Sequence, residues 1–188
     1  MRVVIVAHNL SAGGGVSVGR NIFKSLLDTV PDWFFLIIHP ENCGYEEVAT
    51  GNATVSRFAR RNGGVFKRGL FEFFVLPKII KDFEPDVILC LGNMACWRLA
   101  YPQVMLFHNA YFVYPARHYG RSADLRLYLL VFVQKLIFRF DLTRIKHLLV
   151  QTETIRHRVE KLGFPSQSVS VLPNAVSFFL SADMQESI

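Results

Sequence analysis

The sequence predicts a doubly wound α/β fold around a mainly parallel, Rossmann-like sheet, and three observations support this prediction. Short runs rich in Val, Ile, Leu and Phe recur along the chain. Most of them are continuously apolar rather than alternating, which is typical of strands covered on both faces. Segments with helical periodicity separate these runs, and turn-forming residues stand between them. Alternation of this kind indicates a parallel sheet with helices packed on it.

The expected elements follow one another regularly. The chain opens on an apolar run that is too short for a signal peptide and is interpreted as the first strand. Gly163 stands where a helix would end, and Pro85 and Pro165 follow the second and fourth expected helices. The expected strands are residues 3–7, 34–39, 54–58, 87–91, 104–108, 148–152 and 169–172, and the expected helices are residues 16–29, 70–82, 122–141 and 154–162.

The composition describes a globular chain with spare apolar surface. The 188 residues are 51% hydrophobic and only 19% charged, which excludes an intrinsically disordered chain. The excess of apolar residues suggests a surface kept for a membrane, a partner or a second domain. Cys43, Cys90 and Cys96 lack the spacing of a disulfide framework or a metal site, so we expect no metal and a reducing cytoplasm. No segment is long and uncharged enough to span a bilayer.

Basic residues are concentrated in two stretches. The net charge is +6, and of the 21 lysines and arginines five lie in residues 57–68 and seven in residues 117–146. This clustering indicates an anionic partner such as a membrane surface, with solvated loops and helix faces as the alternative. Nucleic acid is not expected as a partner. The candidate membrane-facing residues are Arg60, Arg61, Lys67, Arg68, Arg121, Lys135 and Arg139.

The expected helix at residues 122–141 has an unusual pattern. Its polar residues fall on one narrow stripe, and the rest of its circumference is apolar except at Arg126. One interpretation, which we favour, is a helix docked deeply against the sheet. The other is a helix partly buried in the lipid interface, with its cations near anionic headgroups. The stripe consists of Arg121, Asp124, Tyr128, Lys135 and Arg139.

Ligands of such sheets bind at the carboxyl ends of the strands, so the residues that follow strands are the candidate site. His108 ends an apolar strand and is the candidate catalytic residue, although a lone histidine is often structural. His8 closes the first strand, and Asn109 follows His108, so both are candidate substrate- or donor-binding residues. The loop at residues 92–93 lies at the same edge.

The glycine-rich segment at residues 11–20 follows the first strand and opens a helix. Free backbone N–H groups at a helix N-terminus can bind an anion, so Gly14 and Gly15 are candidate ligand-contacting residues. A tight turn without a ligand is the alternative. The spacing does not match the dinucleotide fingerprint, which would need a glycine where this chain has Val18. It does not match the P-loop either, which would need Lys-Ser/Thr where this chain has Arg20-Asn21. A flavodoxin-like or dinucleotide-binding domain is therefore disfavoured.

Three motifs, taken in order, resemble family 4 glycosyltransferases, and the resemblance covers the chain from residue 1 to about 180. In that family the last motif usually reads Ile-Pro-Asn-Gly-Val-Asp, and here Ala175 and Ser177 replace Gly and Asp. The motifs are the glycine loop Gly13-Gly14-Gly15 with Gly19-Arg20, the strand-ending Phe107-His108, and Val171-Leu172-Pro173-Asn174-Ala175-Val176.

The resemblance implies the GT-B architecture, in which two Rossmann-like domains face a cleft. It implies metal-independent transfer of a sugar from a nucleotide-sugar, with retention at the anomeric carbon. His108 would contact the transferring sugar and the acceptor, and Gly14 and Gly15 would approach the donor diphosphate or the acceptor. Asn174 would lie at the hinge. The nucleotide-sugar would be a co-substrate bound mainly by the other domain, and no further cofactor is implied.

Residues 1–174 are thus expected to form the acceptor-binding N-terminal domain, and residues 175–188 to begin the interdomain linker. The donor domain, with its Glu-x7-Glu motif, is expected to be absent. The expected function is the acceptor-binding half of a retaining glycosyltransferase acting on a glycan or lipid-linked acceptor, inactive alone, in the cytoplasm or at the inner membrane face. The alternative is a non-catalytic or split-subunit module that binds a donor-domain partner or a membrane surface.

Overall fold

The structure is a computed structural model, and it describes residues 1–11, 13–58, 68–114 and 125–173. Within these residues, seven strands form one parallel sheet in the order β3-β2-β1-β4-β5-β6-β7. Each expected strand is present, with ends that differ by at most two residues. The strands are β1 (Arg2–Val6), β2 (Phe34–Pro40), β3 (Ala53–Phe58), β4 (Val87–Cys90), β5 (Gln103–Phe107), β6 (His147–Val150) and β7 (Val169–Val171).

The strand order reverses between β1 and β4, and this reversal places the candidate site. The chain first builds outward from β1 to β3 and then returns to the other side of β1 with β4. Val3 of β1 therefore pairs with Phe35 of β2 on one side and Val87 of β4 on the other. In open parallel sheets a crevice forms at such a point, beyond the carboxyl ends of the strands. The predicted doubly wound fold is confirmed.

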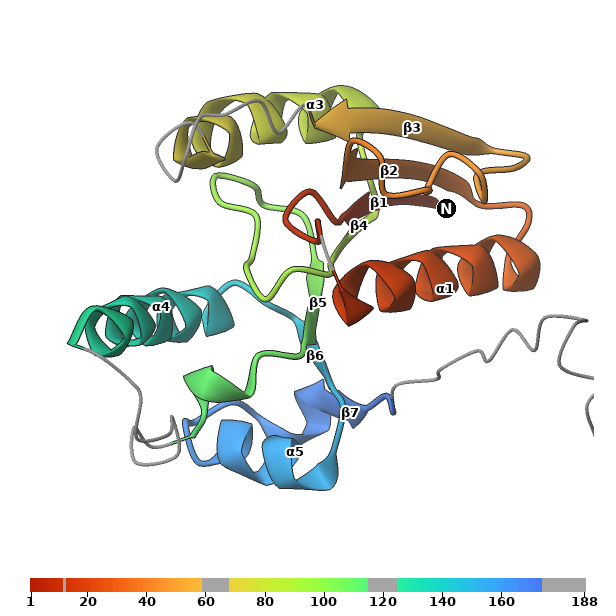
Figure 1. Cartoon of the computed structure of the whole chain (residues 1–188). Coiled ribbons are helices and arrows are strands. Elements are labelled where there is room, and N and C mark those ends of the chain that lie inside the picture. Colours follow the sequence, from red (N-terminus) through yellow and green to blue (C-terminus); the bar gives the residue numbers. More distant parts are fainter. Residues whose placement is uncertain (12, 59–67, 115–124, 174–188) are drawn as a thin grey trace, which may run out of the picture.

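The helices cover the two faces of the sheet unequally (Figure 1). One side chain cluster lies between the sheet and α1, and the other packs α3, α4 and α5 against the opposite face. The expected helix at residues 70–82 is present, but it contains a π-helical turn, η1. The helices are α1 (Gly14–Thr29), η1 (Phe71–Val75), α3 (Leu76–Phe83), α4 (Leu125–Leu142) and α5 (Glu153–Glu160), with short 3-10 turns η2 (Ala110–Phe112) and η4 (Ser166–Ser168).

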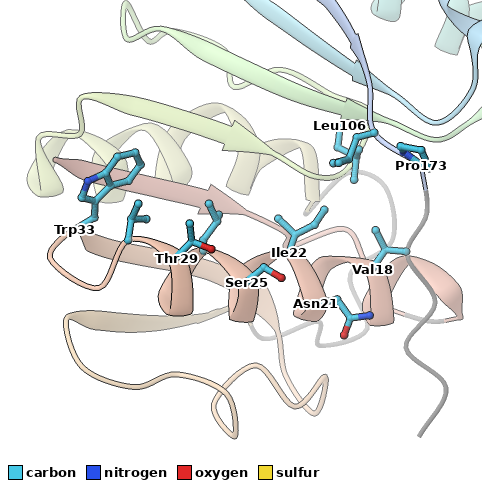
Figure 2. A pocket seen from close by; sticks show the side chains of 11 residues that line it. Val18, Asn21, Ile22, Ser25, Thr29, Trp33, Leu106 and Pro173 are labelled. Carbon is cyan, nitrogen blue, oxygen red and sulfur yellow. The ribbon is translucent and has the colours of Figure 1, made fainter.

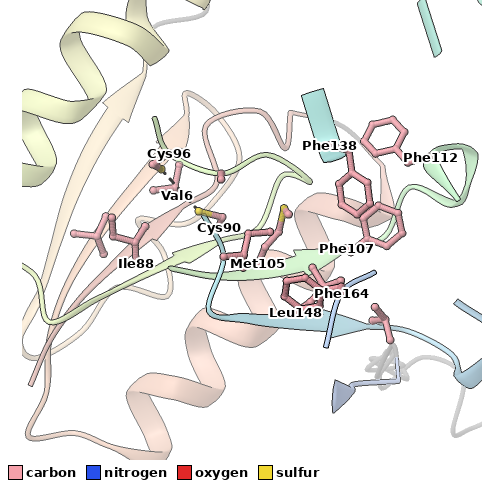
Figure 3. Close-up of a cluster of buried hydrophobic side chains, with 14 of the residues drawn as sticks. Val6, Ile88, Cys90, Cys96, Met105, Phe107, Phe112, Phe138, Leu148 and Phe164 are labelled. Atoms are coloured by element: carbon pink, nitrogen blue, oxygen red, sulfur yellow. Dashed lines mark hydrogen bonds between the residues drawn. The ribbon is translucent and has the colours of Figure 1, made fainter. Parts of the chain in front are cut away.

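Aromatic rings anchor α4 to the sheet. Phe138 of α4 stacks on Phe107 of β5 with ring centroids 4.6 Å apart, and Phe112 of η2 lies 5.6 Å from Phe138 (Figure 3). All three rings are buried. Burial of such large side chains contributes much of the stability of this face, at about 1.5–3 kcal/mol for each side chain.

The interpretation of α4 as a deeply docked helix is wrong. Val131 and Phe138 are buried against the domain, but Phe132 is 58% exposed and Leu129 is 63% exposed. Lys135, one of the predicted membrane-facing cations, is half-buried and donates from Nζ to the carbonyl of Tyr114 at 2.7 Å. The helix therefore has two apolar faces, of which only one packs on the sheet. In the described residues, no helix is long and apolar enough to cross a membrane.

Candidate functional site

The residues that follow β1, β4 and β5 come together at the carboxyl edge of the sheet. Asn9, after β1, donates from Nδ2 to the carbonyl of Gly92 at 2.7 Å, after β4. A Cβ on Gly92 would overlap the Asn9 side chain, so a larger residue there would displace this hydrogen bond. His8 and His108, both predicted for the site, lie at this edge because β1 and β5 flank β4 in the sheet.

Asn93 fixes the orientation of His108. Its Oδ1 accepts from the backbone N–H of His108 at 2.7 Å and from that of Asn109 at 3.1 Å. Because two N–H donors hold this oxygen, the amide nitrogen of Asn93 must donate to Nε2 of His108, which is 3.1 Å away. Nε2 is thus an acceptor, and the neutral ring carries its proton on Nδ1.

The surroundings of His108 favour this neutral form. Burial lowers the pKa of the imidazole from its usual 6.5, because a charged ring loses more solvation than a neutral one. Protonation of Nε2 would also set an N–H against the Asn93 amide donor. At pH 7 the side chain is therefore a neutral group whose Nδ1–H can donate a hydrogen bond.

We expect histidine 15N NMR to find His108 as the Nδ1–H tautomer, titrating below pH 6.5. Asn93→Gly should raise this pKa, because Nε2 would lose the donor that blocks its protonation. Glycine suits the backbone here, since Asn93 has a φ of 60°. His157, which is exposed on α5, supplies a comparison signal in the same spectra. An unchanged His108 pKa in the Asn93→Gly variant would show that the amide does not control the ring.

His8 is held by a carboxylate that sequence reasoning did not single out. Oε1 of Glu72, on the π-helical turn η1, accepts from Nε2 of His8 at 2.7 Å and from Nε of Arg68 at 2.8 Å. Burial alone would raise the pKa of Glu72, but the bonds from His8 and Arg68 outweigh it and hold this pKa below its usual 4.5. The sequence signal that could have pointed to Glu72 is its position as the single acidic residue within the aromatic run at residues 70–75.

The other predicted residues fall in several places. Arg68, one of the predicted membrane-facing cations, pairs with Glu72 at the site edge. Asn109 lies beside His108, but its Oδ1 accepts from the backbone N–H of Tyr111 and so caps η2. Arg139 is exposed on α4. Asn174, Arg60, Arg61, Lys67 and Arg121 lie outside the described residues.

The glycines of the turn before α1 have different roles. Gly13 has a φ of 67°, a conformation that favours glycine. A Cβ on Gly19 would overlap the hydroxyl of Tyr45, and one on Gly15 would lie 3.3 Å from Leu10. A Cβ on Gly14 would meet no atom within 4 Å. Tight turning and packing therefore explain Gly13 and Gly19, but they do not explain Gly14.

The contrast between Gly14 and Gly19 can be tested by stability. Gly14→Ala should leave the free energy of unfolding unchanged or raise it by up to about 1 kcal/mol, because alanine favours a helix over glycine. Gly19→Ala should lower it by about 1–3 kcal/mol, because the methyl group overpacks the contact with Tyr45. Urea unfolding measures both. A destabilised Gly14→Ala variant would make Gly14 a structural residue.

The described residues also contain an apolar groove away from this edge. It has a volume of about 330 Å³ and runs along α1 toward the end of β7 (Figure 2). None of the described residues that line it has a titratable side chain. Its wall includes Val18, Ile22, Thr29, Trp33, Leu106 and Pro173. Within the same described residues, no three His, Cys, Asp or Glu side chains are arranged to hold a metal ion.

The comparisons with known proteins agree on the fold. The model of Glycosyltransferase Family 4 matches residues 35–178. The lipopolysaccharide outer core galactosyltransferase WaaB is similar in structure, with a TM-score of 0.58 at 14% identity over 96% of this chain and 47% of that protein. A UGT transferase from Siraitia grosvenorii has a TM-score of 0.59 at 14% identity, over 98% and 53%.

Proteins with another activity share this fold. UDP-GlcNAc 2-epimerase from Neisseria meningitidis has a TM-score of 0.61 at 12% identity, over 93% of this chain and 47% of the epimerase. Fold alone therefore does not decide the reaction, and only the family match points to glycosyl transfer. The chain spans about half the length of these solved structures. No curated protein matches the sequence.

Proposed function

The chain belongs to glycosyltransferase family 4, and on this basis we propose that it is the acceptor-binding half of a retaining glycosyltransferase. The enzyme moves a sugar from a nucleotide-sugar to a glycan or a lipid-linked acceptor. A donor-binding half, as a second domain or a partner subunit, supplies most contacts to the nucleotide. The domain acts in the cytoplasm, a setting supported by the free thiols of Cys43, Cys90 and Cys96.

The state of His108 is the observation that carries this proposal. Asn93 holds the ring neutral, with the proton on Nδ1, at the carboxyl edge of the sheet. A neutral N–H donor suits a sugar hydroxyl, because it can fix the hydroxyl's orientation without removing its proton beforehand. His108 therefore positions the transferring sugar and the acceptor toward each other.

The turn before α1 supports a role toward negative charge. The first turn of α1 contains no acidic residue, and its N-cap residue, Gly13, has no side chain that could cap the helix. Its backbone N–H groups would stabilise the charge that develops on the departing diphosphate. Since a Cβ on Gly14 would meet no protein atom, the backbone there is open to close approach.

NMR titration of the 15N-labelled chain tests the proposal. We expect mono- and oligosaccharides to shift the signals of His108, His8 and residues 13–15. The signals of His157 and of the other described residues should stay unchanged. UDP alone should bind more weakly than it does to a complete enzyme. Tight binding of NAD or FMN with no response to any saccharide would instead support a dinucleotide-binding domain. Binding of a donor-domain partner without any saccharide response would support the non-catalytic module.

A further inference from the structure

Two neighbouring elements expose large apolar side chains to solvent. On η1, Phe74 is 60% exposed, and Leu70, just before η1, is also exposed. On α4, Leu129 and Phe132 are exposed to about the same degree as Phe74. Single exposed apolar residues are ordinary, but a contiguous group marks an interaction site. We call this group the apolar strip, and it consists of Leu70, Phe73, Phe74, Val75, Leu129, Phe132, Val133, Leu136 and Phe140.

The two parts of the apolar strip are joined by Trp97 and Arg98, in the connection between β4 and β5. The guanidinium of Arg98 lies 4.8 Å from the ring centroid of Phe73. Trp97 contacts Phe140 edge-on, with ring centroids 5.8 Å apart. Figure 1 shows this connection between α3 and α4. The exposed side chains of η1 and α4 therefore belong to one surface.

The strip on α4 is a regular helix face. Residues 129, 132, 133, 136 and 140 follow the spacing i, i+3, i+4, i+7 and i+11, which places them on one side of a helix. Val131 and Phe138 are on the side that packs against the domain, where they are buried. A helix that serves only the core would present polar residues outward. The outward apolar face of α4 is therefore available to a second apolar medium.

Within the described residues, arginine side chains lie beside the strip. Arg98 and Arg139 are exposed, and the guanidinium of Arg144 lies 3.8 Å over the ring of Phe140. The carboxylates in the described parts of η1 and α4 are both engaged. Glu72 accepts from His8 and Arg68. Asp141 is fully buried and accepts from the backbone of Ala95 and from Trp97.

We propose that the apolar strip docks this domain on an anionic lipid bilayer. The strip enters the boundary between headgroups and acyl chains, and Arg98, Arg139 and Arg144 bind headgroup phosphates. Arg98 and Arg144 are held in place by the aromatic rings that they contact. Lipid fits better than a second copy of the chain, because a two-fold interface would bring the same arginines face to face. η1 carries Phe73 and Phe74 into the strip and Glu72 into the site. If the proposed transferase function holds, docking therefore keeps the site near a lipid-linked acceptor; docking itself does not depend on that function.

Flotation of the full chain with vesicles tests this proposal. We expect binding to phosphatidylcholine vesicles that contain phosphatidylglycerol, little binding to phosphatidylcholine alone, and release at high salt. Phe132→Ser combined with Leu136→Ser should weaken binding by about tenfold or more, because these side chains insert. Phe34→Ser is the matched control, since Phe34 is 49% exposed on β2, outside the strip. Arg139→Gln should weaken binding about fivefold, and Lys24→Gln, exposed on α1, should not.

Three results would overturn the proposal, provided that circular dichroism shows the variants to be folded like the wild type. One is the absence of binding to either vesicle by folded, monomeric protein. Another is unchanged vesicle binding by the Phe132→Ser/Leu136→Ser variant. The third is self-association of the wild-type chain through the strip. Light scattering would then show a change of oligomeric state in the Phe132→Ser/Leu136→Ser variant, while its binding to vesicles is unaffected.

Discussion

Alanine in place of His108 is expected to lower kcat by about 100-fold or more in the proposed two-part glycosyltransferase. The variant removes the neutral Nδ1–H donor at the carboxyl edge and leaves the Asn93 amide without its acceptor. Its structural cost is one hydrogen bond, about 1 kcal/mol, so the melting temperature should fall by only a few degrees. Steady-state kinetics and thermal unfolding separate the two effects.

His157→Ala is the matched control for His108→Ala. His157 is exposed on α5, where it pairs with Glu160, and its loss should change neither kcat nor the fold. Because the pKa of His108 is lowered, the loss of kcat/KM of the wild type on acidification should begin at a lower pH than an ordinary imidazole would give. Turnover close to that of the wild type in the His108→Ala variant would remove His108 from the site.

Asp141→Ala is expected to cause the largest loss of stability, about 2–4 kcal/mol. The carboxylate of Asp141 is fully buried and accepts from the backbone N–H of Ala95 at 3.1 Å and from Nε1 of Trp97 at 2.8 Å. Alanine leaves both donors unpaired under α4. Urea unfolding at pH 7 measures the change, and Asp82→Ala, at an exposed position of α3, serves as the control. Equal stability of the two variants would contradict a structural role for Asp141.

The same residue predicts how stability depends on pH. Burial, which penalises the charged form, raises the pKa of Asp141 from 3.8 to about 6. Folding therefore favours the protonated carboxyl, and its contribution to stability is present below about pH 4 and is lost as the pH rises through about 6. Asp141→Asn is uncharged at every pH. We expect its free energy of unfolding, relative to that of the wild type, to rise between about pH 4 and about pH 7.

Most of the fold was predictable because its signals are local. Continuous apolar runs such as residues 34–39 suit parallel strands that are covered on both faces. The periodic segments between them form the helices that connect one parallel strand to the next. The carboxyl edge, and with it His8, His108 and the glycine turn, followed from the order of these elements. The π-helical turn within the helix at residues 70–82 was not predicted, and its Glu72 contacts His8, which is 64 residues away in the sequence.

The partners of the site residues could not be predicted, because they are distant in sequence. Asn93 and His108 are separated by 15 residues, and His8 and Glu72 by 64. Which nitrogen of His108 carries the proton depends on the two backbone donors that hold the Asn93 amide. The pattern of Gly13 to Gly19 likewise gave no way to separate packing at Gly19 from the open position at Gly14, since Tyr45 comes from a later loop.

The helix α4 shows the limit most clearly. Its sequence determined that apolar residues surround nearly the whole helix, and that pattern fits burial in the core as well as burial in lipid. Periodicity describes the faces of one helix, but it does not say which face meets the sheet. That choice was made by tertiary contacts, in which Phe138 stacks on Phe107 and the buried Asp141 binds Ala95 and Trp97. These contacts turn Leu129, Phe132 and Leu136 outward, because the opposite sides of a helix cannot pack against the same sheet.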